Sequence, residues 1–358
     1  MLDRLGVGST RAALLGVGVS VAACQHAPAA GGAADPTGAS RAEAAAPPTP
    51  PAPSPPQLLR VSKRTAATHA ERDYFLYLPA GHASMPDKLW PVLLVLHGNG
   101  ERGDAKADLD YLLKNGPLYE AWIQKRDLPF ILIVPQLPMY GRDETADYLK
   151  NRRREEIPAR LEVGVPPRPA EFPTPDAMRG AVAAELPADA TAYGPPMGWP
   201  ELEEDLIGML DDALRERHGD TTRQYLTGLS YGGFGTWYLA SHHPDRFAAI
   251  APVVGYGHPD LMPPIAAAQI PIWCFAGGRD GSVKVKNFYA GLNRLEALGH
   301  RELRFTIEAD MGHDVWARVY GGNDLYDWLL SHQKRPAQAL PSQALSAQGV
   351  PATTRSTP

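Results

Sequence analysis

Residues 224–235 read QYLTGLSYGGFG, and this stretch decides the fold. Its apolar run 224–229 predicts a strand, the pentapeptide GLSYG follows at 228–232, and a helix-compatible segment covers 233–242. Glycines two residues before and two residues after the serine relieve the crowding of a sharp turn between a strand and a helix. Such a turn holds a hydroxyl out over the end of a sheet. The flanking elements therefore make Ser230 a candidate nucleophile rather than part of an ordinary glycine-rich turn.

Strands alternate with helices on both sides of this stretch. The runs 90–96 and 130–134 are continuously apolar, as expected of parallel strands buried on both faces, whereas 58–63 and 73–78 alternate like paired antiparallel strands at a sheet edge. The remaining predicted elements are helices at 201–217, 285–298 and 324–332 and strands at 247–254, 270–276 and 303–308. This order predicts an α/β domain over residues 58–333, built on a doubly wound, mostly parallel sheet.

One long block, residues 138–200, interrupts the alternation. It is rich in proline, arginine, aspartate and glutamate, and it is far longer than an ordinary connection between a strand and a helix. The block follows the carboxyl end of a predicted parallel strand, and this edge is where such sheets bind ligands. We expect either a lid or binding loop over the site or a disordered insertion.

Composition excludes several classes of function. The chain has 358 residues, is 44% hydrophobic and carries a formal net charge of −5, which supports a sizeable core and gives no reason to expect nucleic acid as a partner. Only Cys24 and Cys274 occur, so there is no disulfide framework. Cys274 lies in an apolar run and is expected to be a buried, inert thiol. No His/Cys cluster has metal-ligand spacing, and neither a metal nor an organic cofactor is expected.

The amino terminus reads as an export signal. Residues 1–23 carry Arg4 and Arg11 and then a small, apolar run that is too short to span a bilayer. The run ends in VAAC at 21–24, which resembles the lipobox of bacterial lipoproteins. The resemblance implies cleavage before Cys24, acylation of that cysteine and anchoring of the chain to a membrane of the cell envelope. Gln25 after the cysteine would favour the outer membrane, with the domain facing the periplasm or the exterior; the alternative is a plain export signal and a soluble secreted or periplasmic protein.

Both ends of the chain outside the domain are expected to be disordered. Residues 24–57 consist almost entirely of alanine, proline, glycine, serine and threonine after the cysteine, and this composition cannot bury enough apolar surface to offset its ordering entropy. We interpret this segment as a flexible tether between the lipid anchor and the domain. Residues 334–358 have a similar composition and are interpreted as a disordered tail.

A serine hydroxyl becomes a good nucleophile only when a histidine takes its proton and a carboxylate stabilises the imidazolium. Asp280 directly follows the predicted strand 270–276, and His313 follows the predicted strand 303–308, so the order is Ser, acid, His. Asp310 and Asp314 are rival acids, but they flank the histidine in its own loop. The alternative role for Asp280 is that of a turn aspartate that caps the next helix.

The oxyanion of such a reaction needs backbone N–H donors. The amide of Tyr231, directly after the nucleophile, is the first candidate. The second is expected from the loop HGNGERG at 97–103, which follows the predicted strand 90–96, and we assign it to Asn99 or its neighbour Gly98.

The same loop contains three further polar side chains. We expect His97 to be structural rather than catalytic. Glu101 and Arg102 are expected to form an ion pair that orders the loop rather than a clamp on the substrate.

Five segments together resemble the α/β-hydrolase superfamily: VLLVLHGNGERG, ILIVPQ, YLTGLSYGGFGTWYLASHHPDRFAAIAPVVG, PIWCFAGGRD and MGHDVWARVY. Within it they look like the bacterial esterases related to polyhydroxybutyrate depolymerases, feruloyl and acetylxylan esterases, and the predicted-peptidase group with an HGxGERG loop. The resemblance implies Ser230, Asp280 and His313 as a catalytic triad. It covers 58–333 apart from 138–200, where the family would have a much shorter connection.

The resemblance implies hydrolysis of a small-molecule or polymer-derived carboxylic ester through an acyl-enzyme intermediate. A serine peptidase or an acyltransferase of the same fold is the alternative within enzymes. A non-catalytic binding module at the cell envelope is the alternative outside them, although such proteins usually lack a member of the triad.

Overall fold

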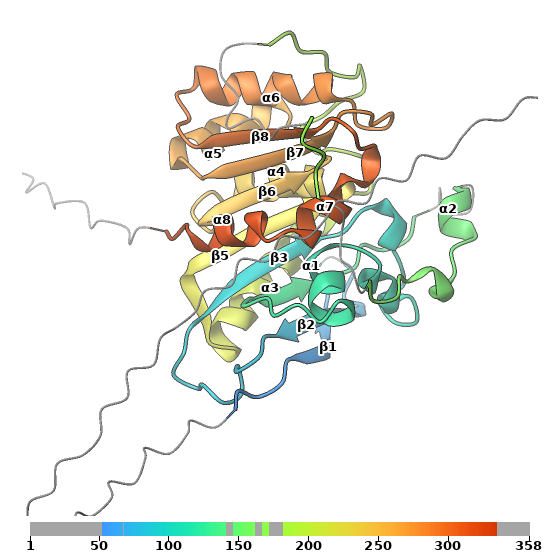
Figure 1. The fold of residues 1–358 in the computed structure, drawn as a ribbon, viewed down its shortest axis with the longest axis vertical. Helices are drawn as coiled ribbons and strands as arrows, with labels where there is room; N and C mark the ends of the chain where they lie inside the picture. Colours follow the sequence, from blue (N-terminus) through green and yellow to red (C-terminus); the bar gives the residue numbers. More distant parts are fainter. Residues whose placement is uncertain (1–51, 67, 141–145, 162–166, 172–181, 335–358) are drawn as a thin grey trace, which may run out of the picture. The chain divides into compact units, whose positions relative to one another are not determined.

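The computed structural model describes residues 52–334 except 67, 141–145, 162–166 and 172–181. The predicted signal, the predicted lipidation site Cys24, most of the tether and the tail from residue 335 therefore lie outside the described residues. The strands are β1 (Gln57–Arg64), β2 (Glu71–Leu78), β3 (Trp90–Leu96), β4 (Ile131–Val134), β5 (Gly219–Leu229), β6 (Ala249–Val253), β7 (Ile272–Gly277) and β8 (Leu303–Glu308). The helices are α1 (Gly116–Leu118), α2 (Asp147–Lys150), α3 (Glu203–Glu216), α4 (Tyr231–His242), α5 (Met262–Ala268), α6 (Val285–Ala297), α7 (Trp316–Gly321) and α8 (Asp324–Leu330) (Figure 1).

The strands form one eight-stranded sheet in the order β1-β2-β4-β3-β5-β6-β7-β8. Strands β3 to β8 pair in parallel, whereas β2 is antiparallel to both β1 and β4. The predictions of a mostly parallel sheet and of an antiparallel pair at its edge are confirmed. Every residue of β3 and β4 is buried, because helices cover both faces there. The edge strand β1 instead alternates between more and less exposed residues.

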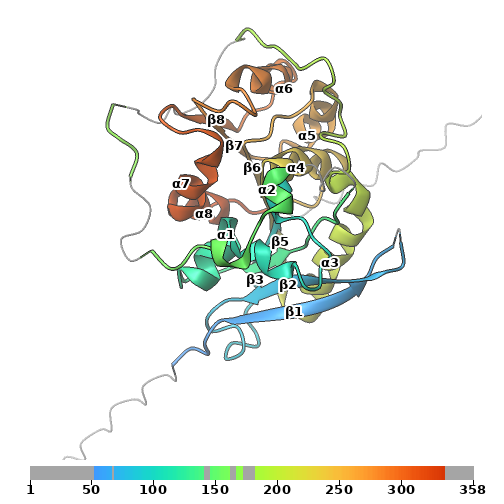
Figure 2. The same cartoon turned by 90° about the vertical axis from the view of Figure 1, so that its right-hand side faces the viewer.

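Two helical layers cover the sheet, one on each face (Figure 2). Buried side chains of α3, α4, α5 and α6 form one apolar cluster with one face of the sheet, and those of α1, α7 and α8 form a second cluster with the other. Helix α3 shows how the sequence specifies this, since it buries Leu206, Met209, Leu210 and Ala213 and places three acids in its first turn. Among the helices of the described residues, none has the length and apolar character that a membrane crossing requires.

Several elements differ from the predictions: β5 begins earlier than expected, and the helices α1, α2, α5 and α7 were not predicted. Strand β5 begins at Gly219, five residues earlier than expected. The reason is that Trp90 of β3 pairs with Gly219, and the amide of Trp90 donates to the carbonyl of His218. Helix α5 was not predicted, because its sequence MPPIAAA carries two prolines in its first turn. Proline is tolerated in the first turn of a helix, where the amide that it lacks would have no partner within the helix.

The described parts of the block 138–200 are attached to the domain at several points. Trp199 is buried at its end, and a Cβ added to Gly235 of α4 would lie 2.6 Å from the indole of Trp199. Glu185 pairs with Lys286 of α6 at 2.5 Å, and Arg168 binds the buried carboxylate of Glu308 at the end of β8. These segments therefore run along the domain surface and contact it.

Candidate active site

Ser230 lies on a strained turn between β5 and α4. Its backbone has φ 52° and ψ −114°, a conformation that non-glycine residues rarely adopt. The turn is so tight that a Cβ on Gly232 would lie 1.8 Å from the carbonyl oxygen of Leu96. The amide of Ser230 donates to the carbonyl of Val253 in β6 at 2.9 Å, which fixes the turn at the carboxyl end of the sheet. Strain of this kind is characteristic of a presented nucleophile.

The three residues expected to form a triad lie in one hydrogen-bonded row. Nε2 of His313 is 3.0 Å from Oγ of Ser230, and Nδ1 of His313 is 2.7 Å from Oδ2 of Asp280. A carboxylate oxygen can only accept, so Nδ1 carries the proton of a neutral imidazole and Nε2 is free to accept the serine proton. The arrangement can therefore increase the nucleophilicity of Ser230.

Asp280 is held as a carboxylate by its surroundings. Its side chain is 0% exposed, and its second oxygen accepts the backbone amides of Ser282 at 2.7 Å and Val283 at 2.9 Å. Burial by itself would raise the pKa of Asp280, but the hydrogen bond from His313 and these two amides lower it below its ordinary value. Asp280 thus also makes the turn contacts of the alternative role.

The two rival acids are placed differently. Both oxygens of Asp310 accept from the guanidinium of Arg318 at 2.8 Å. Asp314 is exposed to solvent. Asp280 is therefore the acid that contacts His313.

The residues expected to donate to an oxyanion lie next to the nucleophile. Tyr231 is the first residue of α4, and the first amides of a helix have no carbonyl partner within it. The loop after β3 packs on the same turn, since a Cβ on Gly98 would lie 2.7 Å from the Leu229 side chain. Asn99 begins a short helical turn, Asn99–Glu101, in this loop. The amides of Tyr231 and of Gly98 or Asn99 are thus in the two segments that surround Ser230.

His97 has the surroundings of a structural residue. It is buried, its Nε2 accepts from the backbone amide of Leu137 at 2.8 Å, and its Nδ1 donates to the carbonyl of Gly98 at 2.5 Å. Burial lowers the pKa of His97 to about 3, so the ring is neutral at physiological pH. Its ring therefore links the loop after β3 to the end of β4.

The ion pair expected between Glu101 and Arg102 does not order the loop. The Glu101 carboxylate instead accepts from the side chain of Asn115, and burial raises the pKa of this carboxyl group above its ordinary value. Arg102 is 0% exposed and donates to Oδ1 of Asn99 at 2.6 Å and to the carbonyl of Pro138 at 2.8 Å. Neighbouring residues in a short helical turn point in different directions, which explains why the two charges separate.

Two tyrosines near the site were missed by the sequence analysis. Tyr140, in the insertion, has its hydroxyl 3.3 Å from that of Tyr231, and the hydroxyl of Tyr148 accepts from the side chain of Asn99. Trp316 packs edge-on against the ring of His313 at 5.3 Å and donates to Asn115 at 3.1 Å. No periodic pattern marks the insertion, so only the cluster of arginines and tyrosines at its start could have indicated these contacts.

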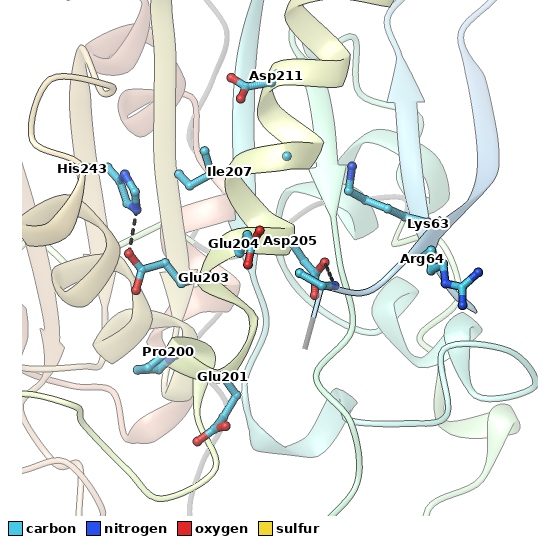
Figure 3. A pocket seen from close by; sticks show the side chains of 12 residues that line it. Lys63, Arg64, Pro200, Glu201, Glu203, Glu204, Asp205, Ile207, Asp211 and His243 are labelled. Carbon is cyan, nitrogen blue, oxygen red and sulfur yellow. Dashed lines mark hydrogen bonds and ion pairs between the residues drawn. The ribbon is translucent and has the colours of Figure 1, made fainter. Parts of the chain in front are cut away.

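A separate cavity of about 760 Å³ lies between β1 and α3 and contains none of the candidate catalytic residues (Figure 3). Acidic side chains of α3 line it, and two of these have partners: Glu203 binds His243 at 2.8 Å and Asp205 accepts the amide of Ala66 at 2.8 Å. Among the residues that the structure describes, no group of three or more His, Cys, Asp or Glu is arranged to hold a metal ion. We therefore place the candidate site at Ser230 rather than in this cavity.

Comparisons with known proteins agree with this topology. The sequence profile of the prolyl oligopeptidase family matches residues 201–262, a stretch that includes Ser230. A thermostable esterase of known structure is similar to the chain with a TM-score of 0.50 and 22% identity, over 77% of this chain and 63% of the esterase. The match thus spans less than two thirds of that esterase.

Two further solved structures are similar at lower scores. A mutant of the feruloyl esterase module from Clostridium thermocellum, complexed with sinapinate, has a TM-score of 0.47 and 15% identity over 78% of this chain and 89% of the module. S-formylglutathione hydrolase from Staphylococcus aureus has a TM-score of 0.47 and 12% identity over 78% of this chain and 98% of that protein. A search of curated proteins found no match. Taken with the strand order, the likeness to the thermostable esterase shows that the chain has the α/β-hydrolase fold.

Proposed function

We propose that the protein is a serine hydrolase that cleaves carboxylic esters through an acyl-enzyme intermediate. The observation that carries the proposal is the unbroken row of two hydrogen bonds from Ser230 through His313 to Asp280. A serine in an ordinary turn does not require a hydrogen bond to a histidine that is itself bound to a buried carboxylate. The strained backbone of Ser230 and its place at the carboxyl end of a parallel sheet support the same assignment.

The reaction would proceed in two halves. Oγ of Ser230 attacks the ester carbonyl carbon while Nε2 of His313 takes the hydroxyl proton, and the amides of Tyr231 and of Gly98 or Asn99 stabilise the oxyanion. The bond to the alkoxy oxygen then breaks, and His313 returns the proton to the departing alcohol. Water repeats the attack on the acyl group with His313 as base, which releases the acid and restores Ser230. Asp280 orients the imidazole and stabilises its charged form.

Two measurements test this function. A fluorophosphonate probe should label the protein, and the Ser230→Ala variant should neither take the label nor hydrolyse p-nitrophenyl acetate while remaining folded by circular dichroism. Retained hydrolysis in that variant would show that Ser230 is not the nucleophile. A wild-type protein that does not react with the probe would instead favour a non-catalytic binding module.

Peptide cleavage is the second candidate activity. The match of residues 201–262 to the prolyl oligopeptidase family favours it, and the triad chemistry is the same for amides and esters. Matched ester and amide substrates with the same acyl group separate the two activities. Efficient turnover of the amide would replace the esterase assignment, since serine peptidases also cleave the matched ester, and transfer of the acyl group to an added alcohol would indicate an acyltransferase.

We also propose that the protein is anchored in the cell envelope by acylation of Cys24. The proposal rests on the sequence of residues 1–24, which carry a charged region, an apolar run and VAAC before Gln25. Metabolic labelling with an alkyne-bearing fatty acid should mark the wild type and not the Cys24→Ala variant. Labelling of both the wild type and Cys24→Ala would contradict acylation at this cysteine. If cell fractionation recovers both proteins in the soluble fraction, the protein is a soluble exported one.

A further inference from the structure

The loop that carries the second candidate oxyanion donor is held from outside by the long insertion. Three of the seven residues at 97–103 are glycines, which have no side chains to fix their position. A Cβ at Gly100 would meet no atom within 4 Å, so this part of the loop has open space beside it. Donors that stabilise a transition state must be held in place before the reaction, and this loop therefore needs contacts from its surroundings.

Arg152 supplies contacts to the backbone of that loop. It follows α2 in the insertion, and its Nη1 donates to the carbonyls of Gly100, at 3.3 Å, and Arg102. Its Nη2 pairs with Asp108 at 2.9 Å, and its guanidinium lies 4.0 Å from the ring centre of Tyr111. The side chain is 7% exposed, although most of the residues around it, 147–156, are exposed to solvent. One buried guanidinium thus fixes two peptide units of the loop against the domain.

The same loop is bound by two other parts of the insertion. The side chain of Asn99 donates to the hydroxyl of Tyr148 and accepts from Arg102. Arg102 in turn donates to the carbonyl of Pro138, at the start of the insertion, and to the carbonyl of Met197, near its end. Its guanidinium also lies 4.9 Å from the ring centre of Tyr231, the residue after the nucleophile.

We propose that Arg152 is a positioning residue for the loop 97–103. Its hydrogen bonds to the carbonyls of Gly100 and Arg102 hold the amides of Gly98 and Asn99 in place for the transition state. This inference rests on the proposed function, because it assigns the residue to the same site. The segment of the insertion that carries Arg152 is then a structural part of the proposed catalytic centre. Arg152 does not itself touch the substrate in this role.

The test compares the full-length wild type with Arg152→Met, Arg152→Lys and the control Arg154→Met. Arg154 lies in the same segment and is 55% exposed, and it contacts Ala107 and Asp110 rather than residues 98–103. With p-nitrophenyl acetate, Arg152→Met should lower kcat about 10- to 100-fold and leave KM within about threefold, because donor geometry acts on the transition state. Arg152→Lys, which keeps the charge and can donate to one carbonyl, should be intermediate.

Two readouts distinguish positioning from a general loss of stability. 2,2,2-Trifluoroacetophenone, which forms a tetrahedral adduct with an active serine, should bind Arg152→Met more weakly by about the factor lost in kcat. Hydrogen exchange of residues 98–103 should be faster in Arg152→Met than in Arg154→Met. If Arg152→Met matches Arg154→Met in kcat, inhibitor affinity and exchange, or if only KM changes, the proposal is wrong.

The exchange measurement also separates this proposal from the proposed function. A wild type that neither cleaves esters nor reacts with a fluorophosphonate would overturn the esterase assignment. Faster exchange at 98–103 in Arg152→Met would still support the role of Arg152 in holding the loop. Unchanged exchange in an active enzyme would overturn the role of Arg152 alone. If Arg152→Met does not fold, Arg152→Lys gives the same comparisons against Arg154→Met.

Discussion

Asp280 and His313 are joined by a hydrogen bond of 2.7 Å between Oδ2 and Nδ1, and this carboxylate is buried completely. Its other oxygen accepts two backbone amides, so Asp280 is locked in one orientation by the turn that presents it. The turn contacts of Asp280 and its hydrogen bond to His313 are therefore compatible, because they use different oxygens of one carboxylate.

The Asp280→Asn variant should have a kcat for p-nitrophenyl acetate that is lower by about 10⁴-fold, because an amide that donates to Nδ1 stabilises the wrong imidazole tautomer. Asp314→Asn is the control, since Asp314 is an exposed acid beside the same histidine. Its kcat should stay within about threefold of the wild type, because the charge of an exposed side chain is screened by solvent. A large loss in Asp314→Asn together with an active Asp280→Asn would reverse the assignment of the acid.

Stability should depend on pH through His97. Its pKa in the folded protein is about 3, below its ordinary value of 6.5, because the ring is buried. As the pH falls below about 6.5 the unfolded chain therefore takes up a proton that the folded protein does not, and folding loses about 1.4 kcal/mol per pH unit until about pH 3. His97→Gln should be less stable than the wild type at pH 7.5 but should lose less stability between pH 7.5 and pH 5.

Urea unfolding at pH 7.5, 6 and 5 measures these slopes. The control is His69→Gln, which replaces an exposed histidine, and its pH dependence should follow the wild type. Equal slopes for His97→Gln and the wild type would show that His97 does not titrate as its burial requires.

The three candidate catalytic residues could be picked out in the sequence because each one follows a predicted strand. Ser230, Asp280 and His313 come after β5, β7 and β8, whose carboxyl ends meet at one edge of the sheet. The sheet could be predicted because strands that are buried at every residue, such as β3 and β4, have sequences that are apolar throughout.

The contacts of the insertion could not be predicted in this way. Arg152 and Tyr148 reach the loop after β3 from a segment without any periodic apolar pattern, and these contacts depend on the path of the chain in three dimensions. The roles of Glu101 and Arg102 were missed for a related reason. Their partners, Asn115 and Pro138, lie 14 and 36 residues further along the chain.

Removal of most of the insertion should change the choice of substrate as well as the rate. The carbonyls of Pro138 and Met197 bind the same guanidinium, that of Arg102, so the two ends lie close enough to be joined by a short Gly-Ser linker in place of residues 140–198. We expect the shortened protein to fold and to show a lower kcat for every ester, because the deletion removes Arg152 and Tyr148. A panel of p-nitrophenyl esters of increasing acyl length, with acetyl and feruloyl esters added, should also show an altered order of preference. An unchanged order would rule against a role for the insertion in shaping the pocket.

The turn that carries Ser230 should not tolerate a side chain at Gly232. A Cβ there would lie 1.8 Å from the carbonyl oxygen and 2.5 Å from the carbonyl carbon of Leu96, and these backbone atoms belong to the buried strand β3 and cannot move aside. Gly232→Ala should therefore destabilise the protein by about 1 to 3 kcal/mol or more and displace Ser230 from His313, as expected of overpacking in a closed core. Gly281→Ala is the matched control, because a Cβ at Gly281 meets no atom within 4 Å, and it should change stability by no more than about 0.5 kcal/mol. Chemical denaturation and the rate of fluorophosphonate labelling measure the two effects, and a Gly232→Ala variant as stable and as reactive as Gly281→Ala would contradict the close approach of this turn to β3.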